Sequence, residues 1–232
     1  MLVIFGTRYC GEVDSHCGQG QLTRFFHIYH VPIVPLETKW MTEDLAYGRN
    51  GHDVAWSIRS VVAGYMRTWG PLVALGGLAG GGSFVASAAL LALTAWTWTW
   101  RWVRGERERR RCDHHMHAFG TRCDPLRMKA DLATRLRAEV AERWARAADG
   151  RTPEDVARLG AANPTQAVLA YASLRLAARL APAEQASKAR AASERVLDAC
   201  KDADLALAGG PYRSTAPATL APGPGAGDGA GR

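Results

Sequence analysis

The sequence lacks the short motifs that identify the common catalytic sites. It has no GxxxxGK[ST] phosphate loop, no HExxH metalloprotease motif, no GxSxG nucleophile elbow and no GxGxxG opening a helix after a strand. Its close acidic pairs, Glu12 with Asp14 and Glu154 with Asp155, have no spacing typical of catalytic carboxylates. We therefore predict a protein without catalytic activity.

Charge is missing from one long stretch, the 33 residues 68–100. A membrane-spanning helix needs about 20 predominantly apolar residues to cross roughly 30 Å of hydrocarbon. The whole chain is 47% hydrophobic, too apolar for a fully disordered protein. The uncharged stretch argues against a single-domain soluble enzyme and predicts a membrane segment.

A glycine-rich break at 76–82 divides the uncharged stretch near its middle. Glycine clusters favour turns over helix interiors, so we predict a transmembrane helical hairpin within 54–102, preceded by an amphipathic lead-in. The alternatives are one long tilted span, in which the glycines form a helix-packing surface, and a soluble hairpin buried within the protein. A hairpin places both termini in the cytoplasm, whereas a single span places the N-terminal part outside.

A basic block follows the uncharged stretch directly. Residues 101–111 contain six arginines against Glu106 and Glu108, which accounts for four of the net seven positive charges. Arginines beside an apolar stretch attract anionic lipid headgroups, and tryptophans favour the membrane interface. The predicted membrane-interface residues are Arg101, Arg104, Arg107, Arg109, Arg110, Arg111, Trp96, Trp98, Trp100 and Trp102. No nucleic-acid partner is expected, because no aromatic-rich RNA-binding sheet motif accompanies the block.

Residues 1–53 are typical of a small β-rich module. Runs of aromatic and β-branched residues, which favour strands, are bounded there by glycines and prolines. Its motifs are Phe5-Gly6-Thr7-Arg8, Gly11-Glu12-Val13-Asp14, Thr23-Arg24-Phe25-Phe26-His27-Ile28 and Val31-Pro32-Ile33-Val34-Pro35-Leu36. Over residues 5–102 the chain resembles uncharacterised bacterial membrane proteins, in which a β-rich, sometimes zinc-ribbon-like, module precedes hydrophobic helices. The resemblance implies no activity. The chain departs from a zinc ribbon, since only Cys10 and Cys17 fall in this region.

The chain has only five cysteines. An odd number of cysteines suits a reducing compartment better than a disulfide framework. Thiolate and imidazole suit zinc and related ions, and two Cys/His clusters are candidates. The predicted metal ligands are Cys10, Cys17, Cys112, His114, His115, His117 and Cys123. Because 119–122 repeats the sequence of 5–8, a four-thiolate site shared by Cys10, Cys17, Cys112 and Cys123 is a further hypothesis. The alternatives are ordinary cysteines and histidines on a β-domain and in a solvated linker.

The region 125–207 has alanine, leucine, arginine and glutamate at helical spacing. Helix starts are predicted at Thr152-Pro153 and Asn163-Pro164, with Pro182 separating the last two helices. The helices would form a small bundle or TPR-like hairpins. Residues 103–124 are predicted to be a basic, Cys/His-rich linker, and 208–232 a disordered Gly/Pro/Ala tail.

These patterns together predict an α+β membrane protein with a small N-terminal β-domain, a transmembrane hairpin and a C-terminal α-helical bundle. The expected location is the bacterial inner membrane, with the soluble parts in the cytoplasm. The expected function is that of a membrane-anchored, cytoplasm-facing adaptor or scaffold, with anionic lipid and a protein as partners. The alternative is a metal-binding membrane protein that holds zinc or another transition metal through its Cys/His clusters.

Overall fold

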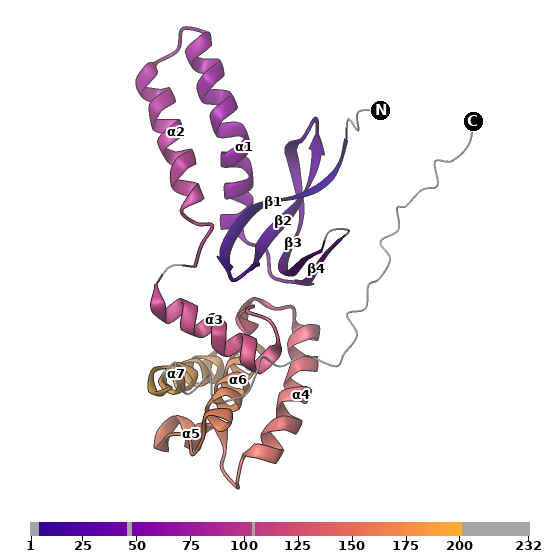
Figure 1. Cartoon of the computed structure of the whole chain (residues 1–232), viewed down its shortest axis with the longest axis vertical. Coiled ribbons are helices and arrows are strands. Elements are labelled where there is room, and N and C mark those ends of the chain that lie inside the picture. The colour runs from indigo at the N-terminus through magenta and orange to yellow at the C-terminus, as the bar shows by residue number, and fades with distance from the viewer. Residues whose placement is uncertain (1–4, 46–47, 104, 201–232) are drawn as a thin grey trace, which may run out of the picture.

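The computed structural model describes residues 5–45, 48–103 and 105–200. These residues form a four-stranded antiparallel sheet, seven α-helices and one short 3-10 turn. The sheet and a long helical hairpin lie at one end of the molecule, and the other five helices lie at the opposite end (Figure 1). The tail predicted to be disordered, 208–232, lies outside the described residues.

The sheet is a meander whose strands follow chain order. Its strands are β1 Phe5–His16, β2 Gln19–Ile28, β3 Val31–Leu45 and β4 Gly48–Asp53. Two-residue turns at Cys17-Gly18 and Tyr29-His30 join the first three strands, and all four turn residues have positive φ. Such turns match the right-handed twist of the strands they connect, so they fix the register of the meander.

Helix α1, Ile58–Ala79, starts against the sheet. Gly11 in β1 permits the close approach, because a Cβ at this position would overlap the backbone oxygen of Ser60. The Ser60 hydroxyl donates to the Gly11 carbonyl at 2.7 Å and accepts from the Thr23 hydroxyl at 2.8 Å. The first turns of α1 therefore belong to the core of the β-domain.

Helix α2, Phe84–Trp98, runs back along α1, and the two form a hairpin that projects from the sheet (Figure 1). The helices approach each other closely at Gly70, where a Cβ would overlap the Thr94 hydroxyl oxygen. Ser83 caps α2 by accepting a hydrogen bond from the backbone N–H of Ala86 at 3.4 Å.

Within the described residues, no helix is long and apolar enough to cross a membrane. The predicted transmembrane hairpin is therefore wrong, as is its alternative of one long span. The same finding overturns the membrane-protein fold class, the membrane anchor and the expected location in the bacterial inner membrane. The fold is instead an α+β arrangement of one antiparallel sheet and seven helices in the described residues.

The physical reason lies in where the two helices begin and end. Helix α2 has 15 residues, which is about 22 Å at 1.5 Å per residue. Helix α1 has 22 residues, but its first part packs on the sheet and includes Arg67. The guanidinium of Arg67 donates to the carbonyls of Glu12 and Thr97, at 2.8 and 2.5 Å. Arg67 thus ties α1 to β1 and to the end of α2, and the uncharged part of α1 that follows it is limited to 68–79.

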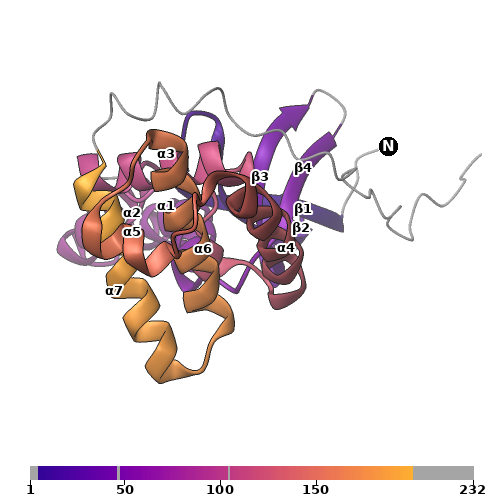
Figure 2. The same ribbon diagram turned by 90° about the horizontal axis from the view of Figure 1, so that it is seen from below.

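The remaining helices form a second unit around α6, Pro164–Leu180, which has buried residues along almost its whole length. It contacts the other four helices of this unit (Figure 2). Those helices are α3 Glu106–Phe119, α4 Ala130–Ala147, α5 Pro153–Leu159 and α7 Ala183–Ala199, with the 3-10 turn η1 at Pro125–Arg127. The segment predicted to be a linker, 103–124, therefore contains a helix, α3.

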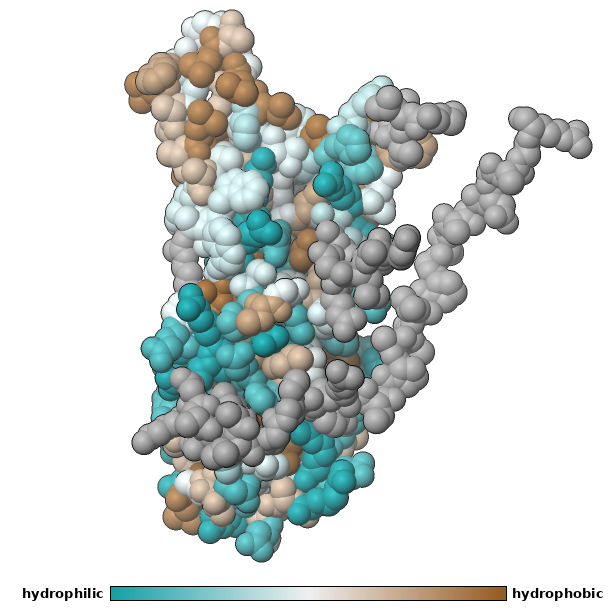
Figure 3. Space-filling view, viewed as in Figure 1, coloured by the Kyte–Doolittle hydropathy of each residue, from teal (hydrophilic) through white to brown (hydrophobic). Residues whose placement is uncertain are grey.

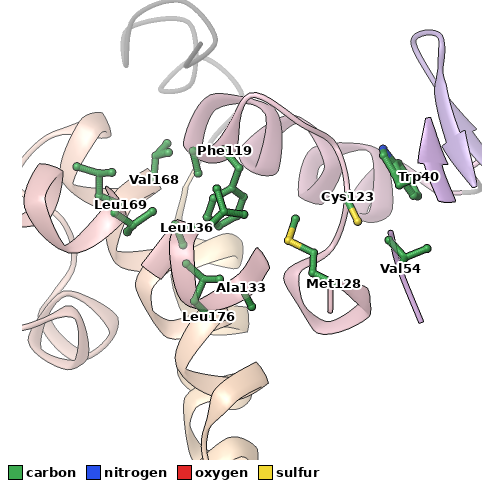
Figure 4. Packing of buried hydrophobic residues seen from close by; sticks show 13 residues of the cluster. Trp40, Val54, Phe119, Cys123, Met128, Ala133, Leu136, Val168, Leu169 and Leu176 are labelled. Carbon is green, nitrogen blue, oxygen red and sulfur yellow. The ribbon is translucent and has the colours of Figure 1, made fainter. Parts of the chain in front are cut away.

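One hydrophobic core joins the sheet to the helical unit. Trp40 and Val54 pack beside Cys123 and Met128, in a cluster that continues to residues of α4 and α6 (Figure 4). Residues Val54 and Met128 also form an isolated antiparallel bridge. On the other side, residues 100–103 run beside β1, with Ser15 N–H donating to the Arg101 carbonyl at 2.7 Å. The two units are thus fixed to each other through side chains and backbone.

Candidate functional site

The predicted metal ligands of the β-domain do not form a site. Cys10 lies in β1, while Cys17 is exposed in the β1–β2 turn. Among the described residues there is no group of three or more His, Cys, Asp or Glu that could hold a metal ion. The prediction of zinc binding is therefore wrong for this part of the chain, and the shared four-thiolate site and the metal-binding alternative lose their basis. Spacing in the sequence does not specify where the strands point these side chains.

The second predicted cluster forms part of helix α3 and faces the helical core. His114 and His115 are buried, and both rings contact Tyr171 of α6, with centroids 5.4 and 5.6 Å apart. His115 Nε2 lies 3.1 Å from the Tyr171 hydroxyl oxygen, within hydrogen-bond distance. His117 is half-buried on the same helix. Two of the three histidines therefore serve as packed core residues.

The buried thiols of Cys112 and Cys123 are held in their neutral form. Burial raises the pKa of Cys112 to about 12, and the nearby carboxylates of Asp113 and Glu108 act in the same direction. Burial also raises the pKa of Cys123 well above its usual value. Since the thiolate is the nucleophile, neither thiol is activated for covalent catalysis at neutral pH.

The tryptophans predicted for a membrane interface pair with arginines at the base of the hairpin. The guanidinium carbons of Arg59, Arg67 and Arg101 lie over the rings of Trp100, Trp98 and Trp102, at 5.5, 5.0 and 5.8 Å from the ring centroids. Trp96 packs edge-on against Trp100 at 5.2 Å. Such cation–π contacts contribute about 0.5–1 kcal/mol each at exposed sites. Arg59 and Arg67 thus join α1 to the end of α2 and to the residue that follows it closely, Trp100.

The arginines of the basic block are engaged largely with carboxylates of the same chain. Arg101 pairs with Glu12 at 2.9 Å, and Arg104 lies outside the described residues. The ion pairs of α3 join Arg107 to Glu194 and Asp198, Arg110 to Glu106, and Arg111 to Glu108 and Glu194. Arg109 is exposed on α3. The block thus links α3 to α7, which sequence spacing alone did not indicate.

A cavity of about 440 Å³ lies where β1, the base of α1, α3 and the turn after α3 meet. Four arginines line it: Arg59, Arg111, Arg122 and Arg127. Its carboxylates are Asp14, Glu108 and Asp124, and its less polar wall contains Trp40, Trp102, Val103, Cys112 and His115. This volume falls within the usual range of small-molecule sites, roughly 300–1,000 Å³.

Sequence reasoning named some of these lining residues but missed the cavity. Arg111, Cys112, His115 and Trp102 were expected to have other roles, whereas Asp14, Arg122, Asp124 and Arg127 were not singled out as site residues. These four come from β1 and from the turn after α3, more than 100 residues apart in the chain. No local pattern in the sequence could have brought them together.

Two residues of the cavity lining, Asp124 and His115, have strongly lowered pKa values. Burial alone would raise the pKa of Asp124, but the nearby charges, with Arg175 hydrogen-bonded to it, lower that pKa to about 2. Burial lowers the pKa of His115 to about 3, so this imidazole is neutral at physiological pH. The cavity therefore presents an ionised carboxylate and an uncharged histidine in the same lining.

The hairpin is the second feature that requires a functional explanation. Eleven large apolar side chains between Trp69 and Trp98 are exposed, and brown hydrophobic residues dominate this end of the molecule in Figure 3. Leu75 and Val85, for example, are 61% and 75% exposed. Exposed apolar patches larger than several hundred Å² mark interaction sites.

The comparisons with known proteins place the chain in no family. No family model, no curated protein and no solved structure matches it. The resemblance to a group of bacterial membrane proteins therefore stays an untested prediction, and function must be argued from the cavity and the hairpin themselves.

Proposed function

We propose that this protein is a non-catalytic scaffold that self-associates through the α1–α2 hairpin. The observation that carries the proposal is the exposed apolar surface of that hairpin (Figure 3). Each copy would contribute its hairpin to a common bundle, while the sheet and the helical unit would remain outside it. The bundle of hairpins would hold the helical units of two copies close to each other.

The size of the apolar surface agrees with a stable dimer. The eleven side chains between Trp69 and Trp98 are each 37–75% exposed, and a typical specific interface buries about 800 Å² on each partner. Burial of apolar surface contributes about 25 cal/mol per Å², from which the costs of association are subtracted.

The absence of charge in the hairpin favours a second copy as the occupant. Residues 68–100 carry no Asp, Glu, Lys or Arg, so a charged partner surface would lose hydration without gaining an ion pair. A second hairpin brings the same uncharged surface. In addition, α2 has Ala86, Ala88, Ala89 and Ala92 along its length, and small residues let helices pack closely.

The test is the mass of the full chain in solution by sedimentation equilibrium. We expect a reversible dimer at concentrations of about 10–100 μM, the range of a moderate protein–protein affinity. Leu75→Glu combined with Val85→Glu should leave a folded monomer. The matched control is Leu159→Glu, which changes a side chain of similar exposure on α5 and should leave the dimer intact.

A charge-complementation experiment sharpens the test. Mixing the Leu75→Glu protein with a Leu75→Lys protein should restore association between the two variants, as opposite charges at a shared interface attract. The proposal fails if the wild-type chain is monomeric. It also fails if the hairpin variants dimerise like the wild type. A monomeric wild type that sediments with neutral phosphatidylcholine vesicles would assign the apolar surface to lipid instead.

A further inference from the structure

We propose that the cavity between the sheet and the helical unit binds a small organic oxyanion, a carboxylate or a phosphate ester with an aromatic or apolar body. This inference is independent of the hairpin and of self-association, because no hairpin residue beyond the first turn of α1 lines the cavity.

The first argument is the excess of hydrogen-bond donors in the lining. Each guanidinium has five N–H donors and no acceptor, and four guanidinium groups belong to the lining. Two buried nitrogens of lining arginines make no hydrogen bond in the described part of the chain: Arg111 Nε, and Arg122 Nε, whose nearest carboxylate oxygen is Asp113 Oδ1 at 3.4 Å. Because buried donors are almost always satisfied, a ligand that supplies acceptor oxygens would complete this lining.

The second argument is that the carboxylates of the lining are already neutralised. Asp14 accepts from Arg59 at 3.2 Å and from Arg127 at 2.7 Å. Asp124 is held by Arg175, from outside the lining, and Glu108 by Arg111. Each carboxylate of the lining is thus paired with at least one arginine, so an incoming anion meets no unpaired carboxylate among the described lining residues. Arg122 has a single ion-pair contact among the described residues, at 3.4 Å from Asp113, so it is the lining arginine least committed to the chain.

The third argument concerns the chemistry of the wall. Trp102, with Val103 beside it, gives the cavity an apolar face. Trp102 is 60% exposed, and the Arg101 guanidinium lies over its ring at 5.8 Å from the centroid. Aromatic rings stack favourably on such side chains. The lining thus combines arginines for the acidic group with an indole for the ligand body.

Titration of the full chain with phenyl phosphate and, separately, with benzoate tests the inference by isothermal calorimetry. We expect saturable one-site binding of at least one probe, and the tighter probe identifies the acidic group. Arg122→Gln should weaken binding by about tenfold, the usual effect of losing one charge-assisted hydrogen bond. The matched control is Arg109→Gln, which changes an exposed arginine of the same helical unit outside the cavity.

A second variant keeps the test decisive if Arg122→Gln does not fold. Trp102→Leu should weaken binding of the aromatic probe while leaving that of inorganic phosphate unchanged, because only the stacking surface is removed. The inference fails if neither probe binds saturably below about 10 mM, a limit weaker than ordinary small-ligand affinity. It also fails if Arg109→Gln weakens binding as much as Arg122→Gln, which would indicate a general attraction to basic surface.

Discussion

Arg175 holds the carboxylate of Asp124 with two nitrogens, Nε at 3.2 Å from Oδ1 and Nη2 at 2.7 Å from Oδ2. The arginine lies on α6 and the aspartate just after α3, so this bidentate pair fixes the turn that carries Arg122 and Arg127. A third contact, from Arg175 Nη1 to Glu194 Oε1 at 3.0 Å, extends the network to α7. The pair thus organises one wall of the cavity.

Replacing Arg175 by Met should destabilise the protein by about 3–5 kcal/mol, because Asp124 would remain as a buried charge without its partner. Urea denaturation of the full chain measures this change. The control is Glu184→Gln, which breaks an exposed pair with Lys188 and should change stability by less than about 1 kcal/mol. Equal effects of the two variants would contradict the role assigned to Arg175.

Stability should fall as the pH drops from about 6.5 towards 3, partly through His115. Burial lowers the pKa of this imidazole to about 3, whereas in the unfolded chain it titrates near 6.5. Between these values the unfolded state binds a proton that the native state does not. The contribution is therefore complete above pH 6.5, and it is lost at a slope approaching about 1.4 kcal/mol per pH unit.

The variant His115→Gln should remove this slope while retaining a polar group beside Tyr171. Burial also lowers the pKa values of His114 and His52, so a smaller dependence of the same sign should remain in the variant. Urea denaturation at pH 7, 6 and 5 gives the comparison. An unchanged slope in the variant would show that His115 is accessible to protons in the native state.

Gly11→Ala should destabilise the protein by about 3 kcal/mol, since the new Cβ would overlap the Ser60 backbone at a residue with positive φ. Gly18→Ala is the control, because Gly18 also has positive φ but a Cβ there would meet nothing within 4 Å. Strain alone should reduce the stability of that variant by about 1–2 kcal/mol. Thermal unfolding of both variants separates the close approach from backbone strain, and equal losses would contradict the tight contact at Gly11.

The packing of the hairpin is tested by two glycines of the same helix. Gly70→Ala should separate α1 from α2 and destabilise the chain by about 2 kcal/mol, as its Cβ would meet Thr94. Gly76→Ala meets nothing within 4 Å and should stabilise α1 by up to about 1 kcal/mol through helix propensity. Circular dichroism during thermal unfolding measures both, and destabilisation by Gly76→Ala would contradict the hairpin geometry.

Helix starts were predictable where local chemistry sets them. Thr152 and Asn163 cap α5 and α6 as predicted, since each side chain accepts a backbone N–H at the first turn. Helix α3 was not predicted, because its arginines and histidines are typical of a polar linker. Its stability comes from ion pairs with Glu194 on α7 and from the contact with Tyr171, both distant in sequence.

The membrane prediction failed because a count of uncharged residues does not show where helices start. Arg67 and the first turns of α1 pack on the sheet. The uncharged stretch 68–100 is therefore divided between the end of α1 and the shorter helix α2. The cavity was equally inaccessible to sequence reasoning. Its arginines and carboxylates come from several segments, and only the packing of α3 against the sheet brings them together.

Residues 100–103, between α2 and α3, also protect an open strand edge. β1 pairs with β2 on one side only, so its other edge would offer backbone groups to strands of other molecules. Asp14 and Ser15 instead donate to the Trp100 and Arg101 carbonyls, and Val103 donates to the Ser15 carbonyl. A change that frees 100–103 would therefore expose a template for edge-to-edge aggregation while the sheet itself stayed folded.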